Sequence, residues 1–406
     1  MRAYERFLNY AVVYTRSDEN SRTVPSTARQ FDLANLLARE LLALGVADAA
    51  VDDNCVVFGH IPATPGREHE PPLGFLAHMD TADYAAEHVV PRLWPNYGGG
   101  ALDLGHGVVL SPERFPHLRA LRGRTLITAS GDTLLGADDK AGVAEIMTMA
   151  ETLLAGKTPH GPVCLAFTPD EEVGEGTAHF DLARFGAKYA YTVDGGAEGE
   201  IEYENFNACA ADFRIRGVDV HPGSAKGVMV NAVLVAAELN AMLPPDEIPA
   251  RTEGYEGFYH LLELRGIPSE AFVHYIVRDH SAEGFAARKA FLRRVEQAIN
   301  EKYGPGTAVL GMRDQYHNMA ELIRRHPQLV ENAKRAAEAA GLKPKVVPIR
   351  GGTDGALLAE KGLPCPNLGT GGYCFHGPFE HITCEGMDGA AAMLTALAAM
   401  PRKGEN

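Results

Sequence analysis

Val163-Cys-Leu-Ala-Phe-Thr-Pro-Asp-Glu-Glu-Val-Gly174 is the stretch on which the prediction of the fold depends. Its first five residues form an apolar run that is typical of a buried strand, and two adjacent carboxylates, Glu171 and Glu172, follow closely. In an extended segment successive side chains point to opposite sides, so one glutamate can bind a cation while its neighbour faces the space beside it. The pattern therefore indicates a metal ligand next to a free base.

Two other apolar runs end in the same way. Residues 73–77 lead into His78, with Asp80 two positions later, and residues 189–193 lead into Asp194. Imidazole is a preferred zinc ligand, and a nearby acid can fix the tautomer and orientation of the ring. His78 with Asp80 would on its own indicate only a structural histidine. Three such strand ends favour a ligand site, because in an open α/β sheet ligands collect outside the carboxyl ends of the strands.

A further pair of acids, Asp138 and Asp139, stands at the start of a segment with the apolar spacing of an amphipathic helix. Helix capping and a favourable interaction with the helix dipole explain two acids there without any catalytic role. Taken alone, this pair predicts only the start of a helix. Residues 82–120 contain many Pro and Gly residues and predict a loop region with little regular structure.

The middle of the chain predicts a different kind of domain. Strand-like and helical segments follow in the order β-α-β-β-α-β, which is the split β-α-β arrangement twice over, at residues 209–216, 226–242, 256–264, 271–277, 282–302 and 307–312. We therefore expect a ferredoxin-like domain at 208–317, inserted between two parts of a catalytic domain at 1–207 and 318–406. Further helices are expected at 1–14, 31–44 and 389–400, and one from Ala320 onward.

Composition limits the partners. The chain has 406 residues, 46% of them hydrophobic, and its 53 acidic residues exceed its 38 basic ones, for a net charge of −15. This argues against a nucleic-acid or anionic-membrane partner. No apolar stretch approaches the roughly 18–20 residues that span a bilayer, and charges interrupt the first sixteen positions, so we expect a cytoplasmic protein. The six cysteines form no C-x-x-C pair and are expected to be small buried hydrophobes.

The motifs taken together resemble a known superfamily. In chain order they are His78-Met-Asp80, Gly136-Ala-Asp-Asp-Lys140, Asp170-Glu-Glu172, Asp194-Gly-Gly, His221-Pro-Gly and His376-Gly. This series resembles the co-catalytic zinc exopeptidases, which include glutamate carboxypeptidase, succinyl-diaminopimelate desuccinylase and aminoacylase-1. Stretches such as Ile349-Arg-Gly-Gly-Thr-Asp-Gly355 look more closely like the peptidase T family of tripeptide aminopeptidases. The likeness runs over essentially the whole length.

The resemblance implies a fold and a metal centre. The fold is α/β, a catalytic domain with helices on both faces of a mixed sheet, and the inserted α+β domain serves as a lid. The centre holds two Zn2+ per chain, for which Co2+ or Mn2+ can substitute because N/O ligands suit them too. The implied roles are a bridging ligand (Asp138), ligands of one metal (His78, Asp194), ligands of the other (Glu172, His376), a general base (Glu171), an acid that orients His78 (Asp80) and a helix-start acid (Asp139).

Some assignments stay open at this point. His381 lies close enough to His376 in the sequence to be an alternative ligand, and otherwise it would be a surface histidine. The resemblance makes His221 a candidate oxyanion donor. Asn231, Arg278 and Arg350 are candidates for substrate binding, since an arginine can pair bidentately with a terminal carboxylate, but an ordinary surface arginine explains the last two equally well.

The function expected from the resemblance is that of a di-zinc metallo-exopeptidase that releases the N-terminal residue of tripeptides. A dipeptidase, a carboxypeptidase or an N-acyl-amino-acid amidohydrolase would share the metal motifs. A non-catalytic, metal-dependent binding protein is the alternative from another class, but such a protein would have no need of Glu171. Relatives often pair through the inserted domain, so a homodimer is a further expectation, although the sequence itself marks no interface.

Overall fold

The three strand-like runs lie side by side in the computed structural model, which describes residues 1–403. They belong to a mixed eight-stranded sheet in which β3 runs parallel to β8 on one side and to β9 on the other. The carboxyl ends of these three strands therefore meet at one edge of the sheet. In spatial order the strands are β1 (Ala50–Val51), β2 (Val57–Ile61), β8 (Val163–Thr168), β3 (Leu73–His78), β9 (Tyr189–Gly195), β16 (Asn367–Gly369), β10 (Glu200–Glu202) and β15 (Lys345–Val346).

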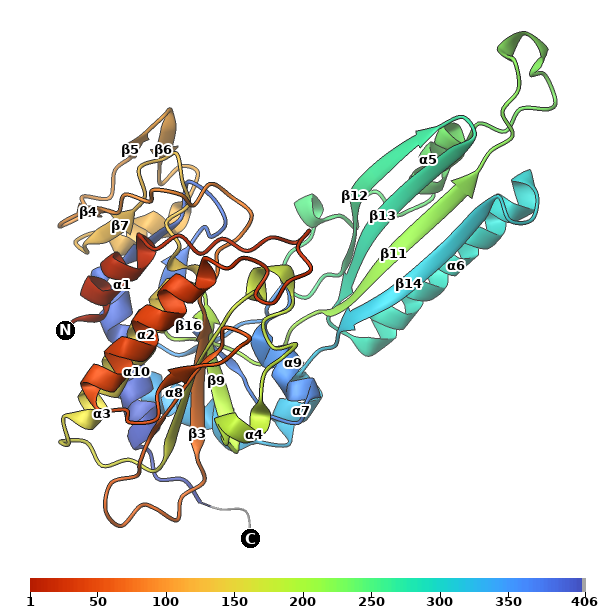
Figure 1. Cartoon of the computed structure of the whole chain (residues 1–406). Coiled ribbons are helices and arrows are strands. Elements are labelled where there is room, and N and C mark those ends of the chain that lie inside the picture. Colours follow the sequence, from red (N-terminus) through yellow and green to blue (C-terminus); the bar gives the residue numbers. More distant parts are fainter. Residues whose placement is uncertain (404–406) are drawn as a thin grey trace. The chain divides into compact units, whose positions relative to one another are not determined.

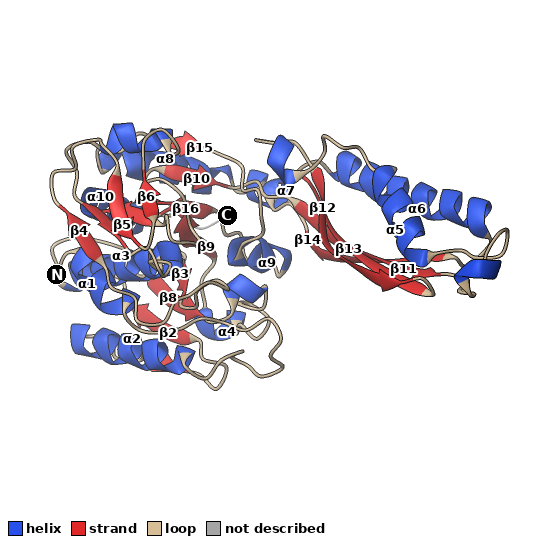
Figure 2. Cartoon of the chain, turned by 90° about the horizontal axis from the view of Figure 1, so that it is seen from above, coloured by secondary structure: helices blue, strands red, loops and turns tan. Residues whose placement is uncertain are grey.

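Helices cover both faces of this sheet, as expected. Figure 2 shows α3 and α10 on one side and α4 and α9 on the other. The second helix ends where the sequence predicted, because Gly45 has the left-handed backbone (φ 106°) that closes a helix. The helices are α1 (Ala3–Ala11), α2 (Gln30–Leu44), α3 (Ala137–Leu154), α4 (Leu182–Phe185), α7 (Ala320–Arg324), α8 (Pro327–Ala339), α9 (Asp354–Glu360) and α10 (Cys384–Ala399).

The region from 82 to 120 is more regular than predicted. It contains β4 (Arg92–Trp94), the hairpin of β5 (Leu102–Gly105) and β6 (Val108–Leu110), and the 3-10 helix η1 (Pro116–Leu121). The prediction of little regular structure was wrong because strands of three or four residues are too short to show a periodic pattern. A second small sheet, in the order β17-β18-β7-β4, joins this region to the C-terminal part of the chain through β7 (Leu126–Thr128), β17 (Gly372–Tyr373) and β18 (His381–Thr383).

The middle of the chain forms its own four-stranded antiparallel sheet with two helices. Its strand order is β12-β13-β11-β14, which is 2-3-1-4 when the strands are counted along the chain, the order of a ferredoxin-like sheet. Phe213, Val273 and Leu292 are among the residues buried in its core. The elements are β11 (Asn207–Arg216), η3 (Pro222–Ser224), α5 (Ala232–Ala241), η4 (Pro249–Arg251), β12 (Phe258–Ile267), β13 (Glu270–Asp279), α6 (Ala282–Tyr303) and β14 (Ala308–Tyr316).

The chain thus divides into two compact units (Figure 1). The first unit comprises Met1–Tyr203, Leu322–Val347 and Thr353–Asn406, and the second comprises Glu204–Glu321 and Pro348–Gly352. The short stretch 348–352 belongs to the second unit, whereas the sequence placed it in the returning catalytic domain. The domain bounds and the lid role drawn from the sequence stay predictions. None of the helices within residues 1–403 combines the length and the apolar character needed to cross a membrane.

Candidate active site

Side chains from three adjacent strand ends converge at one edge of the large sheet. His78 is the last residue of β3 and pairs in register with Thr168, the last residue of β8. Glu171 and Glu172 follow β8, and Asp194 is the last residue but one of β9. The Nε2 atom of His78 is 3.5 Å from Asp194 and 4.0 Å from Glu171. The parallel strands therefore bring together residues that are distant in the sequence, such as His78 and Asp194.

Asp138 lies between two histidines. Its Oδ1 atom is 2.9 Å from Nε2 of His78, and its Oδ2 atom is 3.0 Å from Nε2 of His376. The same nitrogen of His376 is 3.1 Å from Glu172. One carboxylate thus faces two neighbouring sets of ligand atoms, one with Asp194 and the other with Glu172. We call these five residues, His78, Asp138, Glu172, Asp194 and His376, the strand-end centre.

Asp139 is a further potential ligand. Its carboxylate groups with His78 and Asp194 within 4.8 Å, as closely as Asp138 groups with His78 and Glu172. However, one oxygen of Asp139 already accepts a hydrogen bond from the backbone N–H of His78, at 3.1 Å. Asp139 is also fully buried. The prediction of an ordinary helix-start acid did not include this contact with β3. Its position favours a role in holding β3 against the start of α3.

The two glutamates follow β8 in a different conformation from the one expected. Residues Glu171–Val173 form the 3-10 turn η2, and Asp170 before them has a left-handed backbone (φ 56°). The argument from extended chain was therefore wrong, because in a 3-10 turn neighbouring side chains are about a third of a turn apart and need not face opposite ways. Asp80 fixes this turn, since its two oxygens accept the backbone N–H groups of Glu171 (3.0 Å) and Glu172 (3.2 Å).

Asp80 also contacts His78. The Nδ1 atom of His78 is 3.3 Å from the carboxylate of Asp80 and 3.1 Å from its backbone oxygen. Both acceptors favour a proton on Nδ1. This leaves Nε2, which faces Asp138, as the ring atom that could bind a cation. Asp80 is fully buried, so water does not compete for these contacts. It therefore connects the imidazole of one strand end with the turn at the next.

Glu380 holds the Asp138 segment in place. Its carboxylate accepts three backbone N–H groups, those of Leu135 (2.6 Å), Gly136 (2.8 Å) and Asp138 (3.0 Å). No local pattern in the sequence marks Glu380, because its partners are more than 240 positions away. Burial raises the pKa of Glu380 to about 7, although the three donors oppose the shift.

The strand-end centre is crowded with buried carboxylates. Burial raises the pKa of Asp194 to about 7 and the pKa of Glu171 well above its usual value, with nearby acids adding to both shifts. Hydrogen bonds to Asp138 and Glu172 raise the pKa of His376 to about 11. One oxygen of Glu172 is buried with no hydrogen-bond partner among the described residues. Such an excess of buried negative charge, with an unpaired oxygen and imidazole nitrogens, matches the ligand set that divalent cations bind.

Comparison with known proteins agrees with this arrangement. Residues 203–307 match the model of the peptidase dimerisation domain. Peptidase T of Edwardsiella ictaluri (strain 93-146) is 50% identical over 397 residues, which cover 97% of this chain and 96% of that protein. The chain belongs to the peptidase T family.

Two solved structures show the same fold. The aminopeptidase PepT of Bacillus cereus ATCC 10987 has a TM-score of 0.77 at 24% identity and covers 98% of this chain and 97% of its own. A dinuclear metal-binding peptidase of the M20 family from Bacillus subtilis has a TM-score of 0.64 at 17% identity, with 98% of each chain covered. The protein is a metal-using exopeptidase, and the sequence prediction of this enzyme class and of the family is confirmed.

His381 does not take part in the centre of this peptidase T family member. Its Nε2 atom faces His117 at 2.9 Å, whereas His376 is the histidine that contacts Asp138. The reading of His381 as a surface residue was wrong as well, because its side chain is fully buried. No local pattern indicates this contact, because 264 positions separate His381 from His117.

The four candidate substrate residues all lie in the second unit. His221 is exposed at the start of η3, and Asn231 caps α5 by accepting the N–H groups of Val233 and Leu234. Arg278 donates to Gln315 at 2.9 Å. Arg350 donates to the backbone oxygens of residues 254 and 256 and stacks on the rings of residues 206 and 258. Each has a partner within its own unit, and the partner of the His221 ring is the nearby backbone N–H of Gly223. The roles of these four residues toward substrate stay predictions.

Proposed function

We propose that this chain is a two-metal aminopeptidase that releases the N-terminal residue of tripeptides. The observation that carries the proposal is the pair of ligand sets that share Asp138, with Glu171 beside them. One cation would be held by His78, Asp138 and Asp194, and the other by Asp138, Glu172 and His376. Zn2+ suits these nitrogen and oxygen ligands, and Co2+ or Mn2+ would substitute.

The metals and the protein would divide the chemistry. Two bound cations would lower the pKa of a water molecule and polarise the scissile carbonyl. The carboxylate of Glu171 would accept a proton from the attacking water and then donate it to the leaving amine. Glu171 is free for this task because neither ligand set requires it. A non-catalytic, metal-dependent binding protein would not explain why Glu171 lies beside the two ligand sets.

Asp80 would act as a positioning residue. Through one carboxylate it contacts the ring of His78 and accepts the two N–H groups of the turn that carries Glu171 and Glu172. His78, Glu171 and Glu172 would thus keep fixed positions relative to one another during turnover. Such outer contacts commonly change metal affinity or activity by about 10–100-fold when they are removed.

Replacement of the base tests this division of roles. Glu171→Gln should keep the same metal content as the wild type, measured by plasma mass spectrometry, while kcat falls by at least about 100-fold. Glu172→Gln is the matched variant, one residue along in the same turn, and it should lose metal. If Glu171→Gln lost metal to the same extent as Glu172→Gln, Glu171 would be a ligand and the scheme would be wrong.

Substrate length and end groups need a separate test. The family resemblance supports tripeptides, whereas a dipeptidase, a carboxypeptidase or an N-acyl-amino-acid amidohydrolase would share the same metal ligands. A free tripeptide should be cleaved at its first bond at least about tenfold faster, in kcat/KM, than the corresponding dipeptide or N-acetylated tripeptide. Undiminished cleavage of the N-acetylated tripeptide would contradict the aminopeptidase proposal. His221, Asn231, Arg278 and Arg350 are the residues we propose for reading the peptide ends.

We also propose that the protein pairs as a homodimer through the second unit. The match of residues 203–307 to the peptidase dimerisation domain supports this assembly. Light scattering coupled to size-exclusion chromatography should give twice the 43.7 kDa mass of the chain. A monomer at micromolar concentration would contradict it.

A further inference from the structure

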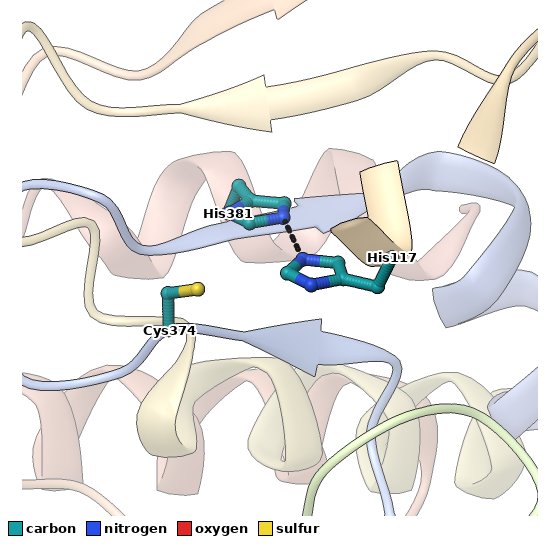
Figure 3. A group of neighbouring side chains, drawn as sticks. All are labelled: His117, Cys374 and His381. Carbon is teal, nitrogen blue, oxygen red and sulfur yellow. Dashed lines mark hydrogen bonds between the residues drawn. The ribbon is translucent and has the colours of Figure 1, made fainter. Parts of the chain in front are cut away.

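A second group of potential metal ligands lies in the first unit and shares no residue with the strand-end centre. It consists of His117, Cys374 and His381, whose ligand atoms all lie within 4.8 Å of one another. Figure 3 shows the thiol of Cys374 beside the two facing rings. The residues come from η1, from the position after β17 and from the start of β18. We call them the His-Cys-His group.

The two rings meet edge to edge. Their planes differ by only 7°, and their centroids are 5.1 Å apart while the two Nε2 atoms are 2.9 Å apart. The centroid distance exceeds the nitrogen distance by about twice the distance from ring centre to ring atom, so the rings lie nearly in one plane with Nε2 pointing at Nε2. Neither ring stacks its face on the other. Without an ion, one of the two nitrogens must carry the proton that joins them.

The tautomer of His381 is set by its other nitrogen. Nδ1 of His381 lies 2.7 Å from the backbone oxygen of Phe379 and must donate to it, which leaves the lone pair on Nε2. The ring of His117 is held on its face by Tyr373, at a centroid distance of 4.5 Å and an angle of 10°. Burial lowers the pKa of His381 to about 4 and also lowers the pKa of His117, so both rings are neutral near pH 7.

Among residues 1–403, no carboxylate belongs to this group of potential ligands, although the charge of Glu380 acts on the thiol of Cys374. The three members are two imidazoles and a thiol, and the residues packed beneath them form an apolar cluster that includes Leu118, Leu126 and Phe379. A thiolate with two imidazoles is a soft to borderline ligand set, which favours Zn2+ over the hard cations Mg2+ and Ca2+. Three protein ligands leave one tetrahedral position open for water or a small ligand.

We propose that the His-Cys-His group binds one transition-metal ion, Zn2+ in the first instance, at a third site distinct from the strand-end centre. Binding forms bonds from the ion to Nε2 of both histidines and to the sulfur of Cys374, and it releases the thiol proton to solvent. Two nitrogens on a tetrahedral zinc are ~3.4 Å apart, given Zn–N bonds of about 2.0–2.1 Å. The nitrogens therefore separate by about half an ångström from the hydrogen-bonded state, and the rings also turn so that both Nε2 lone pairs point at the ion.

That movement is available to His117. It lies on a short 3-10 helix and is only partly buried, whereas His381 is fully buried in a strand. The bound ion would link His117 of η1 to Cys374, which lies two positions before His376. The site itself does not depend on the function proposed above, but any effect of this link on catalysis rests on the role proposed for His376.

Cobalt separates the third site from the other two. Titration of the metal-free full-length protein with Co2+ should produce an intense near-ultraviolet band from thiolate-to-cobalt charge transfer, which ligands of nitrogen and oxygen alone do not give. Cys374→Ser should abolish the band. With Zn2+, the wild type should hold one equivalent more than Cys374→Ser by plasma mass spectrometry. Absence of the band in the wild type, or its persistence in Cys374→Ser, would overturn the proposal.

Two further variants serve as controls for the assignment of the cobalt band to Cys374. Cys55→Ser makes the same thiol-to-hydroxyl change at a buried cysteine that, like the partly buried Cys374, has a left-handed backbone. Cys55 belongs to none of the potential metal groups of residues 1–403, so this variant should keep the band. His117→Gln removes a ligand from the partly exposed member and should weaken Co2+ binding at this site by at least about tenfold. If Cys374→Ser failed to fold, an unchanged band in folded His117→Gln would still contradict the assignment.

Discussion

The first unit brings histidines together in two places, and the two groups are stabilised in opposite ways. In the strand-end centre two imidazoles face several buried carboxylates, and hydrogen bonds to Asp80, Asp139 and Glu380 hold the surrounding backbone. In the His-Cys-His group two neutral rings satisfy each other and pack on aromatic and aliphatic side chains. The first group lacks the positive charge to balance its acids, whereas the second is complete as a hydrogen-bonded pair. Loss of metal should therefore affect the two groups very differently.

Metal removal should have the largest effect. Chelation is expected to abolish peptidase activity and to lower Tm by on the order of 10 °C, because the ions stabilise only the folded chain. Burial raises the pKa of Asp194 to about 7 in the metal-free protein, so this carboxyl is protonated below pH 7 and charged above it. The loss of Tm on chelation should accordingly be greater at pH 8 than at pH 6. Scanning calorimetry of both forms at both pH values checks this.

The His117→Gln variant sharpens this comparison. It leaves every residue of the strand-end centre intact, so chelation should lower its Tm by nearly the same amount as in the wild type. If most of the chelator's effect disappeared in this variant, the His-Cys-His group rather than the strand-end centre would be the site on which stability depends.

Glu380→Ala should have the next largest effect. The change leaves three backbone N–H groups, two of them buried, without an acceptor, and we expect the free energy of unfolding to fall by about 3 kcal/mol or more, with weaker metal binding. Urea denaturation and metal content measure the two effects. Glu385→Ala is the control, because this more exposed carboxylate accepts only the N–H of Thr125 and its loss should lower stability by less than about 1 kcal/mol. Equal losses in both variants would contradict the role given to Glu380.

Asp80→Asn should act on turnover more than on folding. The side-chain amide would present a donor where Asp80 accepts two N–H groups, so the turn with Glu171 would shift. We expect kcat/KM or metal affinity to fall by about 10–100-fold. Asp83→Asn, at an exposed ion pair with Arg16, should change neither by more than about twofold. Wild-type activity and metal affinity in Asp80→Asn would show that the centre does not need this support.

Glu202→Gln tests a buried carboxylate that is no candidate ligand. Burial, followed by the charge of Glu200, raises the pKa of Glu202 to about 8. Its contribution to stability is therefore fully present below the unfolded pKa of about 4.5 and is lost as the pH rises through 8. The glutamine should stabilise the protein by about 1 kcal/mol at pH 8 and change little at pH 5, while it still accepts from Asn367. Denaturation curves at the two pH values measure this, and an equal effect at both would contradict the assignment.

The sequence predicted the parts of the fold that depend on local pattern. Apolar runs with a ligand at the end identified β3, β8 and β9, and the order of segments identified the ferredoxin-like sheet. The family resemblance supplied the assignment of Asp138, which local pattern alone would have left as a helix cap. The structure brings Asp138 to both histidines because α3 begins at the same edge of the sheet.

Contacts between distant residues could not be predicted. Glu380 binds amides more than 240 positions away, and His381 faces a ring that belongs to a region expected to be loop. No local spacing indicates such contacts, because each of these residues taken alone is typical of an exposed turn. The turn at Glu171 was missed for another reason: the left-handed backbone of Asp170 redirects the chain, and an aspartate does not require that conformation.

The register of β3 against β8 has a consequence for assembly of the chain. His78 lies opposite Thr168, so a slip of one residue would turn the imidazole to the other face of the sheet and away from Asp138. An ion that needs ligands from several strand ends can be held only after those strands have paired correctly. Tight metal uptake is then a late event in folding, and its time course reports when the parallel core has reached its native alignment.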